Sequence, residues 1–184
     1  KALINRGDLT ITSNFAHCAF NGLLFNSGVF KNNSSSNHTL NADVINWGQF
    51  QGCAGSACTW TLNNSINVSG STAVHVPRIK FAGLDTIYNT GIISVSKSVK
   101  GQGKFINLPN STLSLGMNAD QNESTVNAWE HDGNTIVFNK KGEQNIHGAD
   151  SNKFQNLIIS NSGHKKVQQE IKVINDLTVD TNSI

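Results

Sequence analysis

Short segments in which apolar and polar residues alternate follow one another along the whole chain. Examples are "DLTIT", "GVFKN", "CTWTL", "AVHVPRIKF", "GIISVSKSV", "NTIVFN", "NLIIS" and "IKVINDLTV". Alternation with a period of two is typical of a strand with one buried face. No segment keeps helical spacing for three turns, and the many Gly and Asn residues would interrupt a helix. The pattern therefore predicts an all-β protein.

A motif recurs between these segments. The stretches "LINRGDL", "LFNSGVF", "VINWGQF" and "TIYNTGII" share two mostly apolar residues, then Asn, any residue, Gly, any residue and an apolar residue. The asparagines are Asn5, Asn26, Asn46 and Asn89, so the first two steps are 21 and 20 residues, and the third, of 43, is about twice as long. The chain therefore contains a repeat of about 21 residues.

Looser copies extend the series. The stretch "SINVSGSTAV" places Asn67 where a copy is missing, "FINLPNSTL" has Pro109 in place of the glycine, and "IISNSGHKKV" restores Asn-Ser-Gly. We predict that the motif forms one corner of each repeat. The predicted corner residues are Asn5, Gly7, Asn26, Gly28, Asn46, Gly48, Asn67, Asn89, Gly91, Asn161 and Gly163.

A repeat of about 21 residues holds two or three short strands with their turns, which is the size of one coil of a parallel β-solenoid. We therefore predict a right-handed parallel β-solenoid that occupies residues 1–184 as a single segment. The alternative is an antiparallel β-sandwich. It would explain the strands but not a motif at nearly constant spacing.

The Asn and the Gly that recur in the motif have physical roles in such a coil. Glycine adopts the positive φ that a tight corner needs, and Asn tolerates such positions while bonding to its own neighbouring backbone. Equivalent asparagines of stacked coils also lie above one another, so their amides can pair along the axis as a ladder.

The recurring sequence motif changes near residue 118. Residues 1–118 carry the Asn-x-Gly coils, whereas residues 119–184 contain "GNTIVFNKKGEQNIHG", "FQNLIISNSG", "KVQQEIKV" and "INDLTV". From about residue 130 onward this part resembles the β-solenoid repeats of large secreted surface proteins and gliding-type adhesins of the Bacteroidota. The matching positions are Gly142, Gln144, Ile146, Phe154, Asn156, Leu157, Ile159, Leu177 and Val179. The resemblance implies a solenoid fold and a cell-surface setting.

Composition narrows the range of partners. Charged residues make up 14% of the chain and the formal net charge is +2, which favours neither nucleic acid nor an anionic membrane as a partner. No apolar run approaches the roughly 20 residues that span a bilayer, so no membrane-spanning segment is predicted. The chain starts and stops inside patterned sequence, and we interpret it as a segment of a longer secreted protein.

Three cysteines are present. Cys53 and Cys58 in "CAGSAC" bracket a loop of small residues and could close a short disulfide, which would suit an oxidising compartment, with Cys18 left over. The alternative is that all three thiols remain unbonded, because sequence alone fixes no connectivity.

Candidate catalytic chemistry is sparse. An enzyme built on a β-helix would group two or three acidic residues on one face, but the aspartates here are scattered singly. The densest polar cluster is Glu130, His131 and Asp132, with His147 and Asp150 further on, and an ordinary polar loop explains it better than a metal or acid–base site. No metal-ligand spacing, phosphate-binding loop or nucleophile elbow appears. We predict no catalytic residue, no cofactor and no metal.

Tryptophans are the candidate ligand contacts. Trp47, at the variable position of the corner motif, and Trp129 could stack on sugar rings, and a groove lined by these residues or by Trp60 would indicate glycan binding. The triplet Arg6-Gly7-Asp8 resembles an integrin-binding motif. Only its glycine belongs to the repeated corner, so integrin binding is not expected.

These observations predict a structural or adhesive, non-enzymatic segment of a long extracellular bacterial surface protein or filament. Its expected partners are surface glycans, other cells or copies of itself. The alternatives are a carbohydrate-active β-helix enzyme, either a lyase or a hydrolase, and a glycan-binding module without catalysis.

Overall fold

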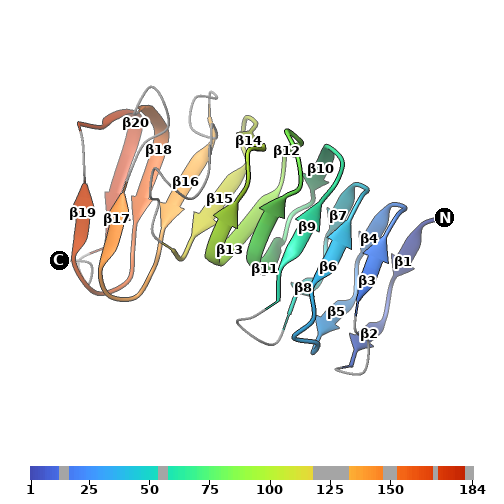
Figure 1. Cartoon of the computed structure of the whole chain (residues 1–184). Coiled ribbons are helices and arrows are strands. Elements are labelled where there is room, and N and C mark those ends of the chain that lie inside the picture. The colour runs from blue at the N-terminus through green and yellow to red at the C-terminus, as the bar shows by residue number, and fades with distance from the viewer. Residues whose placement is uncertain (13–16, 54–57, 118–132, 147–152, 168–169, 181–184) are drawn as a thin grey trace.

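The computed structural model describes residues 1–12, 17–53, 58–117, 133–146, 153–167 and 170–180. All regular structure in these residues is β-strand, and the strands stack from β1 at one end to β20 at the other (Figure 1). Every strand pairing among them is parallel, for example β1 with β4 and β18 with β20. The predicted β-solenoid is therefore confirmed, and the antiparallel sandwich is wrong. These residues include no helix with the length and hydropathy needed to cross a membrane.

Two sheets form the main walls of the solenoid, and their strands follow one another in chain order. The first sheet, sheet A, contains β1 (Leu3–Asn5), β4 (Leu24–Asn26), β7 (Val44–Asn46), β10 (Ile66–Ser69), β12 (Thr86–Asn89) and β14 (Lys104–Asn107). The main path of sheet B contains β2 (Asp8–Ile11), β5 (Val29–Asn32), β8 (Gln49–Gln51), β11 (Ala73–Phe81), β13 (Ile92–Lys100), β15 (Thr112–Leu115), β16 (Thr135–Phe138), β18 (Lys153–Ile159) and β20 (Lys172–Val179). From β1 to β15 each coil thus adds one strand to each wall, and within the described residues β16, β18 and β20 then extend sheet B alone. The coiling is consistent with the right-handed sense that connections between parallel strands prefer.

A third row completes the early coils. It contains β3 (Cys18–Phe20), β6 (His38–Leu40) and β9 (Trp60–Leu62), while β17 (Gln144–Ile146) pairs with β19 (Lys165–Val167) near the other end. The long strand β11 pairs with β8 through its first half and with β9 through its second half. In the two preceding coils the positions that match β11 are divided between two strands, β5 and β6 in one coil and β8 and β9 in the next.

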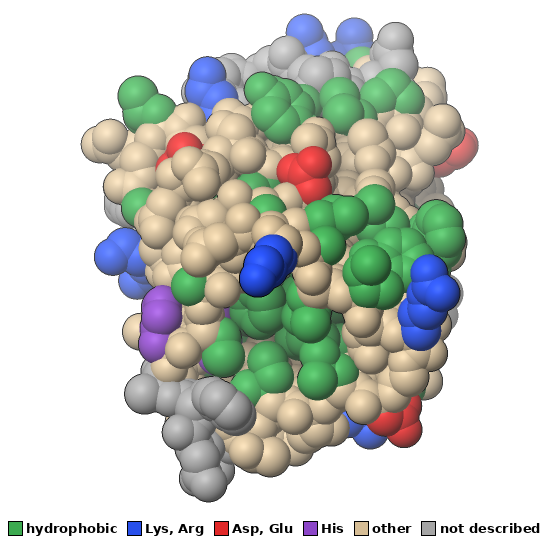
Figure 2. Space-filling model, turned by 90° about the vertical axis from the view of Figure 1, so that its right-hand side faces the viewer, with side chains coloured by type: hydrophobic (Ala, Val, Ile, Leu, Met, Phe, Trp, Pro, Cys, Tyr) green, Lys and Arg blue, Asp and Glu red, His purple; other side chains and the backbone are tan. Residues whose placement is uncertain are grey.

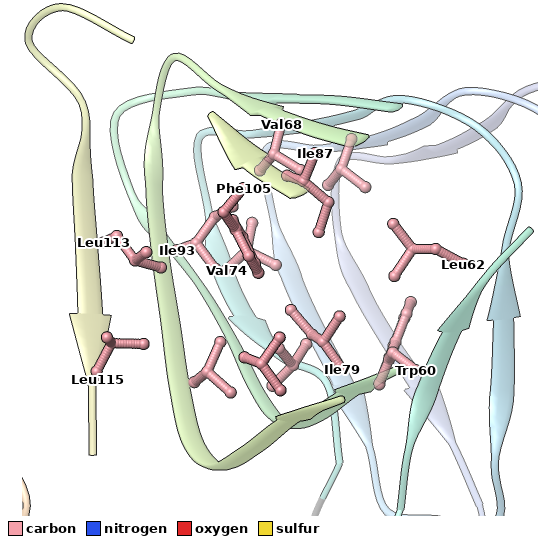
Figure 3. Close-up of a cluster of buried hydrophobic side chains, with 14 of the residues drawn as sticks. Trp60, Leu62, Val68, Val74, Ile79, Ile87, Ile93, Phe105, Leu113 and Leu115 are labelled. Carbon is pink, nitrogen blue, oxygen red and sulfur yellow. The ribbon is translucent and has the colours of Figure 1, made fainter. Parts of the chain in front are cut away.

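Apolar side chains fill the interior because alternate residues of each strand point inward and equivalent residues of successive coils meet. Leu113, Ile136 and Leu157 are partners in register, and each is 0% exposed. Phe30 and Phe50 stack with their ring centroids 4.6 Å apart. Figure 3 shows such side chains, from several coils, directed into one common core. Full burial of each large side chain contributes about 1.5–3 kcal/mol.

The predicted asparagine ladder is present at the corner between sheets A and B. Asn5 Nδ2 donates to Asn26 Oδ1, and Asn26 Nδ2 donates to Asn46 Oδ1, each over 2.7 Å. Asn89 Nδ2 donates to Asn107 Oδ1 in the same way further along. Because the amides lie inside the corner, their pairing satisfies groups that would otherwise be buried without partners.

The reason for the corner glycines differs from the expected one. Positive φ is absent at Gly7, Gly28, Gly48 and Gly91. A Cβ on Gly28 would lie 2.1 Å from the carbonyl oxygen of Gly7, and one on Gly48 would lie 2.0 Å from that of Gly28. Gly28 and Gly48 are therefore required because the backbones of neighbouring coils touch at the corner, not because the corner needs a left-handed residue, whereas nothing lies within 4 Å of a Cβ on Gly7.

The prediction for Asn67 is wrong. Asn67 is exposed, and its backbone N–H and side-chain amide contact the carboxylate of Asp43. Val68 occupies the position in register with Asn89. Thr72 replaces the missing amide, since Asn46 Nδ2 donates to its Oγ1 over 3.0 Å. The register changes in this coil, so the ladder is interrupted.

Asn161 and Gly163 form a different corner from the predicted one. They follow β18, where the chain leaves sheet B, whereas Asn5, Asn26 and Asn46 stand where the chain enters it. Asn161 has φ 66° and Gly163 has φ 107°, and a Cβ on Gly163 would lie 2.4 Å from the Cα of Gly142. Here the positive φ expected of a tight corner is found.

Candidate functional site

An exposed aromatic residue marks the corner of the third coil. Trp47 lies between β7 and β8, and its side chain is 58% exposed. Its ring meets the edge of the Phe25 ring, with 5.4 Å between centroids and 77° between planes. This contact holds the indole in place, while much of the ring remains accessible to solvent.

A groove of about 590 Å³ lies beside Trp47 on the outer face of sheet B. Lys31, Gln51 and His75 are successive partners in register on β5, β8 and β11, and each is exposed. Gln49 and Thr72 also line the groove. Their amide, ammonium, imidazole and hydroxyl groups can hydrogen-bond to hydroxyls of a ligand, and an aromatic face can cover an apolar ring surface.

The other tryptophans do not add to this groove. Trp60 is 2% exposed, and its Nε1 donates to the carbonyl of Gly52 over 3.1 Å, so the expectation that Trp60 could line a glycan groove is wrong. Its alternating position on β9 points it into the core, where it stacks on Phe20. Trp129 lies outside the described residues.

A second groove, of about 430 Å³, is basic. Its cations come from the second half of β11, with Arg78 and Lys80, and from the facing part of β13, with Lys97 and Lys100. Lys80 and Lys100 are partners in register. The small net charge of the chain gave no sign of this cluster, because only strand pairing brings these residues together. The cluster can attract a carboxylate or sulfate group.

The carboxylates and histidines expected to be the densest polar cluster, Glu130, His131, Asp132, His147 and Asp150, lie outside the described residues. In the part of the chain that the structure describes, a different group emerges. His38, Cys53 and Cys58 are the one set of three or more His, Cys, Asp or Glu side chains there with ligand atoms close enough to share a metal ion.

The cysteines of this group are joined in a disulfide, with their Cα atoms 6.3 Å apart, and Cys18 is free. Burial lowers the pKa of His38, and the charge of His17 lowers it further. His38 left no signal in the sequence as a partner of these cysteines. It stands 15 residues before Cys53 and belongs to the preceding coil, so only the stacking of loops brings the residues together.

The triplet Arg6-Gly7-Asp8 forms the corner of the first coil, and all three residues are exposed. Asp8 is in register with Val29, and the carbonyl of Gly7 accepts a hydrogen bond from the backbone N–H of Val29 over 2.8 Å. The triplet thus has the place in the fold that the repeat predicted.

No protein-family model, curated protein or solved structure matches this chain.

Proposed function

We propose that the chain is a structural and adhesive segment of an extracellular bacterial surface protein and that it has no enzymatic role. The observation that carries the proposal is the continuation of the strand ladder of sheet B, with its apolar rows, from β2 at one end of the solenoid to β20 at the other. A rod of this kind grows by adding coils, and each coil presents its corners and loops at a regular interval.

Apolar rows reach the surface at each end. At the β20 end, Leu177 continues the row of Leu157, and Val179 continues the row of Ile159. Leu177 is 56% exposed and Val179 is 44% exposed. At the opposite end, Leu3, Leu9 and Ile11 are only partly buried, and Figure 2 shows apolar side chains gathered at the centre of that face.

The strand edges at the ends are also open. Within the described residues, β1 and β2 pair only with β4 and β5, and β20 pairs only with β18. Open edges with apolar side chains recruit further strands. Either another coil or a second copy of the chain would therefore bury these surfaces, and the segment serves as a stackable unit of a stalk or filament.

Concentration-dependent association of the isolated chain tests this proposal. Light scattering across a dilution series should show linear oligomers that dissociate on dilution. A monomer at every concentration, with a melting temperature independent of concentration, would contradict the stacking. Turnover of a polysaccharide by the purified chain would contradict the non-enzymatic part.

A second function, glycan binding without catalysis, is favoured by the groove beside Trp47. An accessible indole next to amide, hydroxyl, ammonium and imidazole groups suits a sugar, which has apolar ring faces and a rim of hydroxyls. A glycan array probed with the chain tests it. Binding that requires Trp47 supports this function, and the absence of any bound glycan contradicts it.

A further inference from the structure

Three side chains that can ligate a metal ion come together from the second and third coils. His38 begins β6, and Cys53 and Cys58 stand on either side of the segment 54–57, between β8 and β9. His38 and Cys58 are 0% exposed and Cys53 is 9% exposed. The three ligand atoms all lie within 4.8 Å of one another. The Cys-x4-Cys spacing is within the range that zinc sites use.

The contacts of Asn32 show that several hydrogen-bond acceptors surround the place where the three side chains meet. Its Nδ2 lies 2.6 Å from His38 Nε2 and 2.8 Å from the carbonyl oxygen of Gly52, and 3.9 Å from Cys53 Sγ. Its Oδ1 accepts a hydrogen bond from the backbone N–H of Ser34, which identifies the other end of the amide as nitrogen. The two hydrogens of one NH₂ group therefore face three acceptors, and a cation would satisfy more of these lone pairs at once.

The imidazole is also incompletely satisfied. The Nδ1 atom of His38 is buried and has no hydrogen-bond partner. Because Asn32 donates to Nε2, the neutral ring carries its proton on Nδ1, where nothing accepts it. Buried polar groups without partners are rare in native proteins, and at ligand-rich positions they point to a bound species.

We propose that in the reduced chain the thiolates of Cys53 and Cys58 and one ring nitrogen of His38 bind a Zn²⁺ ion, which disulfide formation releases. Two thiolates and an imidazole form a donor set that Zn²⁺ prefers, and water or the Gly52 carbonyl can take the fourth position. The site goes beyond the proposed structural function.

Opening and closing the Cys53–Cys58 disulfide requires a thiol–disulfide partner that supplies or accepts two electrons. A dithiol reductant supplies two electrons to the Cys53–Cys58 bond, which breaks to give two thiols, while the reductant becomes a disulfide. Zn²⁺ then replaces the two thiol protons, which pass to water. In reverse, a disulfide oxidant accepts two electrons from the thiolates, the sulfur–sulfur bond forms again, and the ion leaves.

The two states connect different parts of the solenoid. The disulfide closes a loop within the third coil, whereas the ion would also join that coil to the second through His38. Zinc should therefore stabilise the stacking of the two coils, which the disulfide does not do directly.

The test uses the whole chain, reduced with a phosphine, stripped of metal by a chelator and kept free of oxygen. Zn²⁺ titrated against a chromophoric chelator should show one ion per reduced chain, with affinity at least about 100-fold weaker after oxidation. Co²⁺ should give the visible absorption of a tetrahedral site together with a thiolate charge-transfer band. A reduced chain that takes up no Zn²⁺, or takes it up as weakly as the oxidised chain, overturns the proposal.

Matched variants separate this site from chance binding. Cys53→Ser, Cys58→Ser and His38→Gln should each weaken Zn²⁺ binding by about 10-fold or more, whereas Cys18→Ser and His75→Gln should leave it unchanged. Equal losses in the two groups would overturn the proposal. If His38→Gln does not fold, X-ray absorption of the zinc-loaded native chain decides. Two sulfur ligands and one imidazole support the site, and a shell without sulfur overturns it.

Discussion

The side-chain amide of Asn26 donates to that of Asn46 over 2.7 Å, across two strands that are neighbours in sheet A. Both residues are 0% exposed. Asn26 also accepts from Asn5 and donates to the backbone carbonyl of Gln49 over 2.9 Å, so a single amide links three coils. The ladder of asparagine amides is thus buried inside the solenoid and does not lie on its surface.

Replacing Asn26 by Ala should destabilise the protein by about 2–3 kcal/mol, because buried groups of Asn5, Asn46 and Gln49 lose their partner. Urea unfolding with an unchanged slope measures the loss. The control is Asn21→Ala, which removes an exposed amide that accepts from Asn41 Nδ2. It should cost less than about 0.5 kcal/mol. Equal losses in the two variants would show that the ladder adds nothing to stability.

The corner glycines allow a test that needs no change in side-chain chemistry. Gly28→Ala should cost at least about 2 kcal/mol, because its Cβ would lie 2.1 Å from a backbone oxygen and the coils would have to separate. Gly7→Ala is the matched control, since nothing lies within 4 Å of its Cβ position. Thermal unfolding compares the two. A Gly28→Ala variant as stable as Gly7→Ala would refute close backbone contact as the reason for the glycine.

Leu177→Lys should suppress association of the chain at the β20 end, because a charge on an edge strand blocks the docking of another strand. Analytical ultracentrifugation should show the oligomers reduced to monomer, with little change in the melting temperature. Leu84→Lys is the control, since Leu84 is 77% exposed but lies in the connection between β11 and β12. If Leu84→Lys suppresses association equally, the end surface is not the contact.

Trp47→Ala should weaken binding to any glycan that the chain recognises by about tenfold, which corresponds to 1.4 kcal/mol of lost stacking. Trp47→Phe should retain part of the affinity because an aromatic face remains. Tyr88→Ala removes an exposed aromatic residue of β12, outside the groove, and should have no effect. Titration calorimetry with the strongest ligand from an array measures all three. Loss of affinity in Tyr88→Ala alone would place the binding surface elsewhere.

The coil architecture could be predicted because every coil has the same two requirements. It must turn apolar side chains toward the core and give hydrogen-bond partners to the polar groups buried at its corner, so Asn5, Asn26, Asn46 and Asn89 recur at a regular period in the sequence. The prediction fails where a coil meets these requirements with a different residue. Thr72 replaces the amide expected from Asn67, and one threonine in a loop carries no periodic signal.

By itself, the sequence determined the strand period, the parallel stacking and the asparagine ladder, since these are local patterns repeated along the chain. Only the tertiary structure decided that Gly28 is needed for contact between coils, that Trp60 is buried and Trp47 is exposed, and that His38 lies beside Cys53 and Cys58. The glycine contact depends on how closely the coils stack, and the burial of each tryptophan depends on which side of the wall its position faces. The approach of His38 to the two cysteines depends on how connections of different length meet between coils, and residues joined in that way have no fixed separation in the chain that a pattern could reveal.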